Sequence, residues 1–111
     1  MKLLVAGSRN KHPKEEIEEQ IMIHNPSILI HGGAKGVDSV AATAAKKAGV
    51  PTKVFLPDWA SFGRAAGPIR NEAMVLFCDR AIIFWDGKSP GTRNTIELLK
   101  KHGKEYKVIK I

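Results

Sequence analysis

The sequence predicts one α/β domain over residues 1–111, with about five parallel strands and helices on both faces of the sheet. Short apolar runs alternate with longer segments of helical periodicity, which is the pattern of strand–helix–strand units. Hydrophobic residues make up 43% and charged residues 26% of the chain, a balance typical of a soluble domain with one core. Since crossovers between parallel strands are nearly always right-handed, a Rossmann-like three-layer arrangement is expected.

Local patterns place the first two strands and the first two helices. Leu3–Ala6 is a short apolar run and is expected to be a strand. Pro13, followed by a lysine and two glutamates, is typical of a helix start. Ile28–Ile30 suits a strand that is covered on both faces. The next helix is predicted from apolar residues at helical spacing, namely Val37, Val40, Ala41, Ala44, Ala45 and Ala48.

The middle of the chain continues this alternation. Thr52–Leu56 is expected to be the third strand, and Pro57–Gly67 is expected to be a loop. Pro68 is expected to open a helix, because proline favours the first helical position. The side chains predicted to face the sheet from that helix are Ile69, Ala73 and Leu76.

The last third supplies one more strand–helix–strand unit. Ala81–Phe84 is the predicted fourth strand, and Asp86–Gly91 is a predicted turn. Thr92 is expected to cap a helix that ends near Gly103. Tyr106–Ile109 is the predicted final strand, and its interleaved lysines suit a sheet edge.

Glycine and polar residues gather in the segments that follow strands, whereas the segments that precede strands are plain. Open parallel sheets bind ligands beyond the carboxyl ends of their strands, where the strand order reverses. Glycines let backbone N–H groups approach an anion, and a helix N-terminus adds positive potential. A ligand site is therefore expected among four segments, Gly7–Asn10, His31–Asp38, Gly63–Asn71 and Trp85–Thr92.

Arg70 is the leading candidate for a phosphate contact, with a surface ion pair to Glu72 or Asp58 as the alternative. Asp38 is predicted either to bind a ribose or to cap the helix that it opens. Together, the predicted ligand-binding residues are Gly7, Ser8, Arg9, Gly32, Gly33, Lys35, Gly36, Asp38, Arg70, Asn71, Asp86, Ser89, Gly91 and Thr92.

Two further roles are assigned to side chains near these loops. Asp86 and Asp38 are the candidate catalytic carboxylates, should the protein be an enzyme. Trp59 and Trp85 are candidates for stacking on a base, with packing against the sheet edge as the alternative. His31 is expected to be a buried, hydrogen-bonded imidazole rather than a ligand.

Several chemistries are disfavoured. Two glycine-containing segments lead into predicted helices, Gly32–Gly36 and Ser89–Thr92. Neither matches the triphosphate-binding loop or the dinucleotide fingerprint G-x-G-x-x-G, so triphosphate hydrolysis and redox use of NAD are not expected. The four histidines and the single cysteine show no metal-ligand spacing. We therefore expect no metal and no required cofactor, only a nucleotide-derived ligand.

Charge and cysteine content bound the partners and the compartment. A net charge of +7 favours anionic partners, although the spread of the lysines indicates a solvated basic surface for most of them. Cys78 has no partner for an internal disulfide, and no apolar stretch approaches membrane-spanning length. A cytoplasmic protein without a membrane partner is expected. A homodimer is also expected, since a small sheet leaves apolar surface exposed.

Four segments, taken together, resemble one known family: Ala6–Arg9, His31–Asp38, Gly63–Met74 and Phe84–Thr92. The chain resembles the YspA-like, cpYpsA-related branch of the SLOG superfamily, which groups DprA-like and LOG-like Rossmannoid domains. The resemblance implies a sheet that binds nucleotides or nucleotide-derived ligands. LOG-like relatives cleave the N-glycosidic bond of nucleoside 5′-monophosphates, other relatives sense ADP-ribose-like or NAD-derived signals, and DprA-like relatives bind single-stranded DNA.

One position departs from the LOG-like pattern Pro-Gly-Gly-x-Gly-Thr-x-x-Glu. Thr95 stands where the catalytic glutamate belongs, and Glu97 lies two residues further on, well around the helix. The sequence therefore favours a sensor or binding protein for a phosphate-bearing nucleotide derivative, such as an ADP-ribose-like, NAD-derived or nucleoside monophosphate ligand. Two alternatives remain: a nucleoside 5′-monophosphate glycosidase that uses Asp86 or Asp38, and a protein that binds single-stranded nucleic acid.

Overall fold

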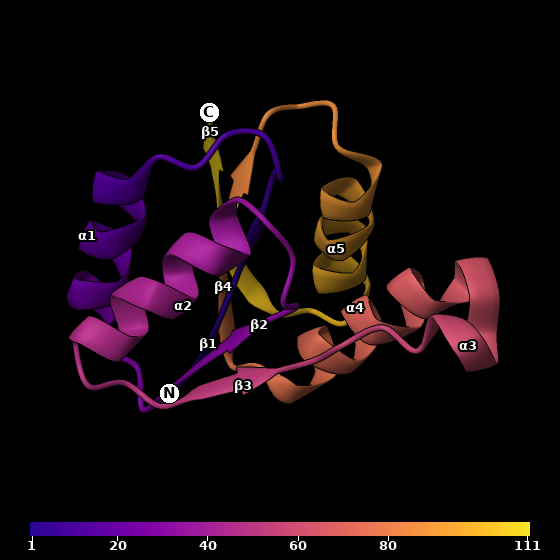
Figure 1. The fold of residues 1–111 in the computed structure, drawn as a ribbon, viewed down its shortest axis with the longest axis horizontal. Coiled ribbons are helices and arrows are strands. Elements are labelled where there is room, and N and C mark those ends of the chain that lie inside the picture. Colours follow the sequence, from indigo (N-terminus) through magenta and orange to yellow (C-terminus); the bar gives the residue numbers. More distant parts are fainter.

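A parallel sheet of five strands runs through the middle of the protein (Figure 1). The computed structural model describes residues 1–111. The strand order is β3-β2-β1-β4-β5, and every neighbouring pair is parallel. The strands are β1 (Lys2–Gly7), β2 (Ile28–His31), β3 (Thr52–Val54), β4 (Arg80–Trp85) and β5 (Glu105–Lys110). The predicted fold class is confirmed.

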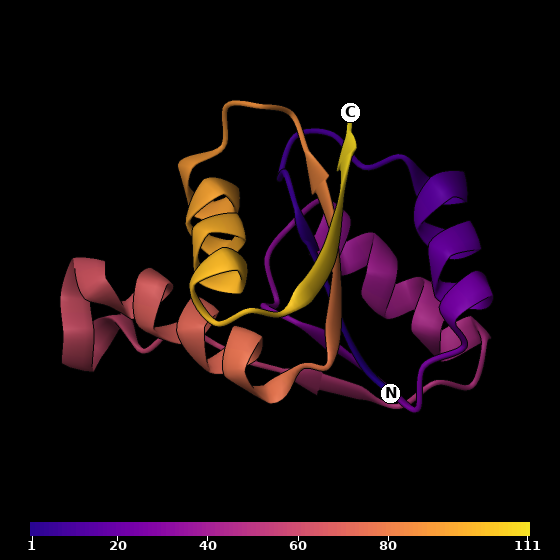
Figure 2. The same ribbon diagram turned by 180° about the vertical axis from the view of Figure 1, so that it is seen from behind.

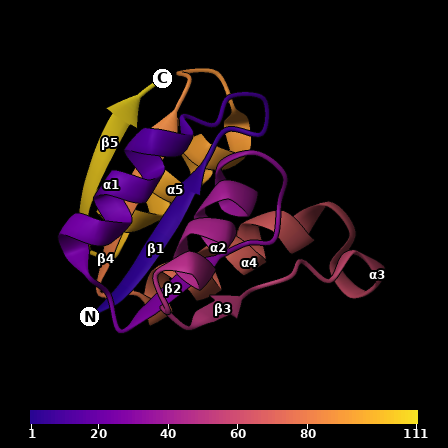
Figure 3. The same cartoon turned by 60° about the vertical axis from the view of Figure 1, so that its left-hand side comes forward.

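Helices cover both faces of the sheet. They are α1 (Lys14–His24), α2 (Val37–Lys47), α3 (Trp59–Phe62), the 3₁₀ turn η1 (Gly63–Ala65), α4 (Ala66–Phe77) and α5 (Pro90–Lys101). Helices α1 and α2 pack on one face, and α4 and α5 pack on the other, as the front and back views show (Figures 1 and 2). Helix α3 projects away from the sheet (Figure 3).

The alternation of side chains along β1 divides the core in two. Leu3 and Val5 face α1 and α2, whereas Leu4 and Ala6 face α4 and α5. All four side chains are buried, which is why the strand appears in the sequence as a continuous apolar run. The alanines of α2 let that helix lie close to the sheet, and Ala41 and Ala45 are fully buried there.

The strand order reverses between β1 and β4. From β1 the chain builds outwards through β2 to β3, and it then crosses to β4 on the opposite side of β1. The loop after β1 leads to α1 on one face, and the loop after β4 leads to α5 on the other face. Two diverging loops of this kind leave a crevice at the carboxyl ends of the two strands.

The two edges of the sheet differ. Strand β5 is an edge strand that carries exposed lysines at positions 107 and 110, as predicted. Strand β3 forms the other edge, and all three of its residues are exposed. It is shorter than the predicted Thr52–Leu56, because only Thr52, Lys53 and Val54 pair with β2.

The prediction for the segment before β4 was wrong in two respects. Helix α4 begins at Ala66, before Pro68, and the expected loop contains α3 and η1. Its buried side chains are Ala66, Asn71, Met74 and Val75, whereas the predicted inward residues Ile69, Ala73 and Leu76 are exposed. The helix has apolar side chains on more than one face, so periodicity alone did not select the packed face. Arg70 donates to the backbone carbonyls of Gly32 and Phe55, and Asn71 donates to the side chain of Asn94 in α5. These hydrogen bonds orient helix α4.

The capping prediction for Thr92 was wrong, and of the two alternatives for Asp38 the capping one is excluded. Thr92 lies inside the first turn of α5, since Ser89 occupies the N-cap position and Pro90 the first helical position. Asp38 does not cap α2, because Gly36 holds that N-cap position and no side chain bonds to it. No helix in the chain is long and apolar enough to span a lipid bilayer.

Candidate functional site

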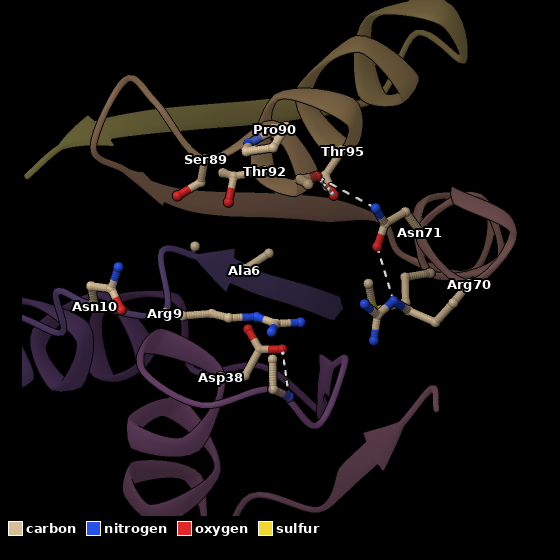
Figure 4. A pocket seen from close by; sticks show the side chains of 14 residues that line it. Ala6, Arg9, Asn10, Asp38, Arg70, Asn71, Ser89, Pro90, Thr92 and Thr95 are labelled. Atoms are coloured by element: carbon tan, nitrogen blue, oxygen red, sulfur yellow. Dashed lines mark hydrogen bonds between the residues drawn. The ribbon is translucent and has the colours of Figure 1, made fainter. Parts of the chain in front are cut away.

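A cleft of about 390 Å³ opens at the carboxyl ends of β1 and β4, where the strand order reverses (Figure 4). One wall comes from the segment after β1 and from Asp38, and the opposite wall is the first turn of α5. Residues of α4 close one end. The cleft is lined by Ala6, Gly7, Arg9, Asn10, Ala34, Asp38, Arg70, Asn71, Met74, Ser89, Pro90, Gly91, Thr92 and Thr95.

Many of the predicted binding residues meet in this cleft. They come from four segments that are far apart in the sequence, which agrees with a site at the reversal point. The predicted residues that line it are Gly7, Arg9, Asp38, Arg70, Asn71, Ser89, Gly91 and Thr92. The predicted residues that do not line it are Ser8, Gly32, Gly33, Lys35, Gly36, Asp86, Trp59 and Trp85.

The glycine-rich loop between β2 and α2 uses its amides internally. The N–H groups of Gly32 and Ala34 donate to Asp38 Oδ2 at 3.0 and 3.3 Å. The N–H group of Gly33 donates to Nδ1 of the buried His31 at 3.0 Å, as expected for a hydrogen-bonded imidazole, and burial lowers the pKa of that histidine. These three amides are therefore not available to a phosphate.

Gly36 has a structural role at the end of this loop. Its φ is +77°, and a Cβ at this position would lie 2.5 Å from the carbonyl oxygens of Ser8 and Arg9. Only glycine fits such a contact without moving the backbone. The loop therefore packs against the segment after β1.

Arg70 is held by backbone carbonyls rather than by an acidic side chain. Its Nη1 donates to the carbonyl oxygen of Gly32 at 2.6 Å and to that of Phe55 at 3.3 Å, and its Nε donates to Asn71 Oδ1. The alternative surface ion pair does not form, since Glu72 contacts His102 and Lys101. The guanidinium is therefore fixed at one end of the cleft (Figure 4).

Asn71 links α4 to α5. Its Nδ2 donates to Asn94 Oδ1 at 3.0 Å and to the Gly91 carbonyl at 3.4 Å. The side chain is buried and lines the cleft. Arg70 and Asn71 together hold α4, the β2–α2 loop and α5 in a fixed arrangement.

The first turn of α5 is open to a ligand. The first hydrogen bond of the helix runs from the N–H group of Arg93 to the Ser89 carbonyl, and no side chain caps the helix. The N–H groups of Gly91 and Thr92 therefore have no partner. Thr92 is 7% exposed, its hydroxyl makes no hydrogen bond within the protein, and Figure 4 shows the hydroxyl pointing into the cleft.

Charge in the cleft is unevenly distributed. Figure 4 shows the Arg9 guanidinium beside the Asp38 carboxylate. Burial raises the pKa of Asp38, while hydrogen bonds from Ala34 and Gly32 and the charges of Arg70 and Arg9 oppose this rise. Two guanidinium groups and an uncapped helix N-terminus thus face one buried carboxylate, and the cleft favours an anion.

Ser8 and Asp86 serve the scaffold of the site. The buried Ser8 hydroxyl accepts a hydrogen bond from the Asp86 N–H group and contacts Ser89 Oγ. The Ser8 carbonyl accepts the Val37 N–H group. The Asp86 carboxylate accepts the N–H groups of Ser89 and Lys88, which lowers its pKa to about 2. Such an acid is a weak general base at neutral pH, and its catalytic role stays a prediction.

The two tryptophans do not line the cleft. Trp59 lies on α3 and is 55% exposed, and Trp85 donates from its indole to the Ser89 carbonyl while Arg93 lies over its ring. No group of three or more His, Cys, Asp or Glu side chains is placed to hold a metal ion.

Comparison with known proteins now identifies the family. Residues 1–62 match the profile of YAcAr, described as the YspA, cpYpsA-related SLOG family. The chain belongs to this family. The chain is also similar to "Gene 61 protein" of Mycobacterium phage D29, to which it is 34% identical over 82 residues, covering 68% of this chain and 66% of that protein.

Two solved structures share the fold of this YAcAr chain. DNA processing protein A (DprA) from Streptococcus pneumoniae superposes with a TM-score of 0.82 at 21% identity, over 96% of this chain and 49% of that one. DNA processing protein A from Helicobacter pylori, described in a single-stranded DNA binding mode, gives 0.79 at 20% identity, over 97% and 64%. The chain thus spans about half to two-thirds of the length of these relatives.

Some cleft residues were not among the predicted ones. Thr95, noted from the sequence only as the replacement for the LOG-type glutamate, lines the cleft and donates to the Gly91 carbonyl at 3.3 Å. Asn10 follows Arg9 in the segment after β1, and its position there was a usable signal. Met74 and Ala34 carry no polar side-chain signal. The cleft of this chain therefore has Thr95 at the position where the LOG-like pattern has a glutamate.

Proposed function

We propose that the protein binds a phosphate-bearing nucleotide derivative in this cleft, with the phosphate at the first turn of α5. The observation that carries this proposal is the pair of unpartnered N–H groups of Gly91 and Thr92 in a cleft that also holds Arg9. Helix N-termini bind anions through such groups. The open Thr92 hydroxyl adds a third donor.

The shape of the cleft supports a small molecule. Its volume of about 390 Å³ lies within the range of small-molecule sites. The proposed ligands are a nucleoside monophosphate, an ADP-ribose-like molecule or an NAD-derived signal, and the protein acts as their sensor or binding protein. Because neither tryptophan lines the cleft, base stacking on these side chains is not part of the proposal.

Isothermal titration calorimetry tests the proposal. The protein is titrated with AMP, ADP-ribose, cyclic ADP-ribose and NAD, with adenosine as the control that lacks phosphate. We expect saturable binding of at least one phosphate-bearing compound and much weaker binding of adenosine. Absence of binding by all four, or equal binding of adenosine, contradicts the proposal.

Single-stranded DNA binding is the second candidate function. It is supported by the fold shared with DNA processing protein A, by the stated DNA binding of the Helicobacter pylori protein, and by the net charge of +7. A protein held mainly by phosphate contacts loses affinity steeply as salt rises. Fluorescence anisotropy with a labelled oligonucleotide at several salt concentrations tests this, and the absence of any anisotropy change removes the candidate.

A nucleoside 5′-monophosphate glycosidase is the remaining alternative. Asp38 is the only predicted catalytic carboxylate that lines the cleft, and burial raises its pKa. Incubation with AMP would then release adenine and ribose 5-phosphate. Activity that survives in the Asp38→Asn variant would exclude this assignment.

We also propose that two copies of the chain pair. Large apolar side chains are exposed between β3 and the end of α4, namely Leu56, Trp59, Phe62, Ile69 and Leu76. Large apolar side chains left exposed can be covered by a second copy of the chain. Light scattering at several concentrations tests pairing, and a monomer at all concentrations contradicts it. The cytoplasmic location is proposed on the sequence grounds given above.

A further inference from the structure

The two carboxylate oxygens of Asp38 have different surroundings. Oδ2 accepts the N–H groups of Gly32 and Ala34 at 3.0 and 3.3 Å. No hydrogen bond within the protein reaches Oδ1. The residue is 6% exposed and lines the cleft, and the two bonds to Oδ2 hold the carboxylate in place.

The neighbouring cations leave Oδ1 open. Arg70 uses its Nη1 and Nε on Gly32, Phe55 and Asn71. Arg9 lies beside the carboxylate in Figure 4 and makes no salt bridge to it. Oδ1 is not a buried atom, because the cleft leaves it accessible. A ligand that fills the cleft would take this oxygen out of water, so the ligand has to supply a donor in return.

The chemistry of the two walls is complementary to a particular ligand. The first turn of α5 supplies donors and suits an anion, whereas Asp38 supplies an acceptor and repels an anion. A carboxylate can accept a hydrogen bond from a neutral hydroxyl, which brings no second charge into the cleft. A molecule with a phosphate at one end and hydroxyls some distance away fits both walls, and a ribose 5-phosphate unit has this form.

We propose that Asp38 Oδ1 accepts a hydrogen bond from a ribose hydroxyl, so that the cleft selects ribonucleotides over their deoxy counterparts. This inference rests on the proposed nucleotide binding. Asp38 would then be a specificity-determining residue. The donors that bind the phosphate cannot by themselves distinguish a ribose from a deoxyribose, whereas Asp38 can.

Calorimetry with AMP, 2′-deoxyAMP and 3′-deoxyAMP tests the inference on the unaltered protein. Loss of a charged hydrogen bond that leaves its acceptor buried predicts about 10–100-fold weaker binding of at least one deoxy compound. If AMP binds and both deoxy compounds bind equally well, the inference is wrong while the proposed function stands. If no phosphate-bearing compound binds, the proposed function itself fails.

The Asp38→Asn variant tests the residue. Asparagine can keep its oxygen on the Gly32 and Ala34 amides and turn its NH₂ group toward the ligand, which replaces the acceptor with a donor. The ribose hydroxyl can still accept from this NH₂ group, but a charged hydrogen bond becomes a neutral one, so we expect the preference for ribose to fall severalfold. The matched variant Arg9→Gln should weaken all three compounds alike and keep the preference. A preference of undiminished size in Asp38→Asn overturns the assignment, and the ligand series on the unaltered protein decides the matter if that variant does not fold.

Discussion

Two glycine-rich loops precede helices near the cleft, and they have opposite uses. In the β2–α2 loop, Asp38, His31 and the Ser8 carbonyl bind the amides. In the β4–α5 loop, the Asp86 carboxylate binds the amides before the helix, and the first turn of α5 stays open. The difference teaches that glycine content marks a loop able to bind an anion, whereas the neighbouring acceptors decide whether it does.

The largest expected contrast is in stability. Gly36→Ala should lower the free energy of unfolding by about 2–4 kcal/mol, because an alanine is strained at this φ and its Cβ meets two backbone carbonyls. Gly91→Ala should change it by less than about 0.5 kcal/mol, since a Cβ there meets nothing. Urea denaturation measures both. Equal losses would mean that the two loops do not differ in structural role.

The next contrast is in ligand affinity. Arg9→Gln should weaken AMP binding about 10–100-fold through loss of a charged hydrogen bond in the cleft. Lys35→Gln removes an exposed cation of the β2–α2 loop that does not line the cleft, and it should change affinity less than about twofold. Calorimetry compares them. A larger loss of AMP affinity in Lys35→Gln than in Arg9→Gln would mean that the phosphate binds at the β2–α2 loop instead.

A smaller effect is expected at the first turn of α5. Thr92→Val should weaken AMP binding about 3–10-fold, because valine keeps the shape of threonine and lacks the open hydroxyl. The control Thr43→Val changes an exposed threonine of α2 outside the cleft and should leave affinity unchanged. Unaltered binding by Thr92→Val would remove that hydroxyl from the site.

The smallest effect concerns pH. The pKa of Asp86 is lowered from 3.8 to about 2, so this group stabilises the folded state above about pH 4 and loses that contribution as pH falls toward 2. Asp86→Asn should therefore flatten the fall in unfolding free energy over this interval, as urea denaturation at several pH values would reveal. The pKa of Asp38 is raised, so its contribution to the free energy of unfolding has the opposite sign. The protonated carboxyl favours the folded state, and this contribution is lost as pH rises. Parallel pH profiles for Asp86→Asn and Asp38→Asn would contradict this contrast.

Strands and the location of the site follow from the sequence because they depend on local pattern and on general topology. Apolar runs placed all five strands, and the position of polar loops after strands placed the cleft. The packed face of α4 did not follow, since its orientation depends on contacts of Arg70 with Gly32 and Phe55, which are 38 and 15 residues away.

The choice between the two loops was also beyond the sequence pattern. Whether an amide is free depends on where the side chains of Asp38 and His31 point, and that depends on the fold around them. The glycines at 32, 33 and 36 therefore looked like ligand contacts although they build the scaffold.

Ser8 gives the molecule a mechanical property. Its backbone joins β4 and α2 through Phe84 and Val37, and its hydroxyl joins the β4–α5 loop through Asp86 and Ser89. One buried serine thus fastens both sides of the crevice to the same strand end. These hydrogen bonds set the width of the crevice, so a ligand must fit a preformed cleft instead of closing two independent walls around itself.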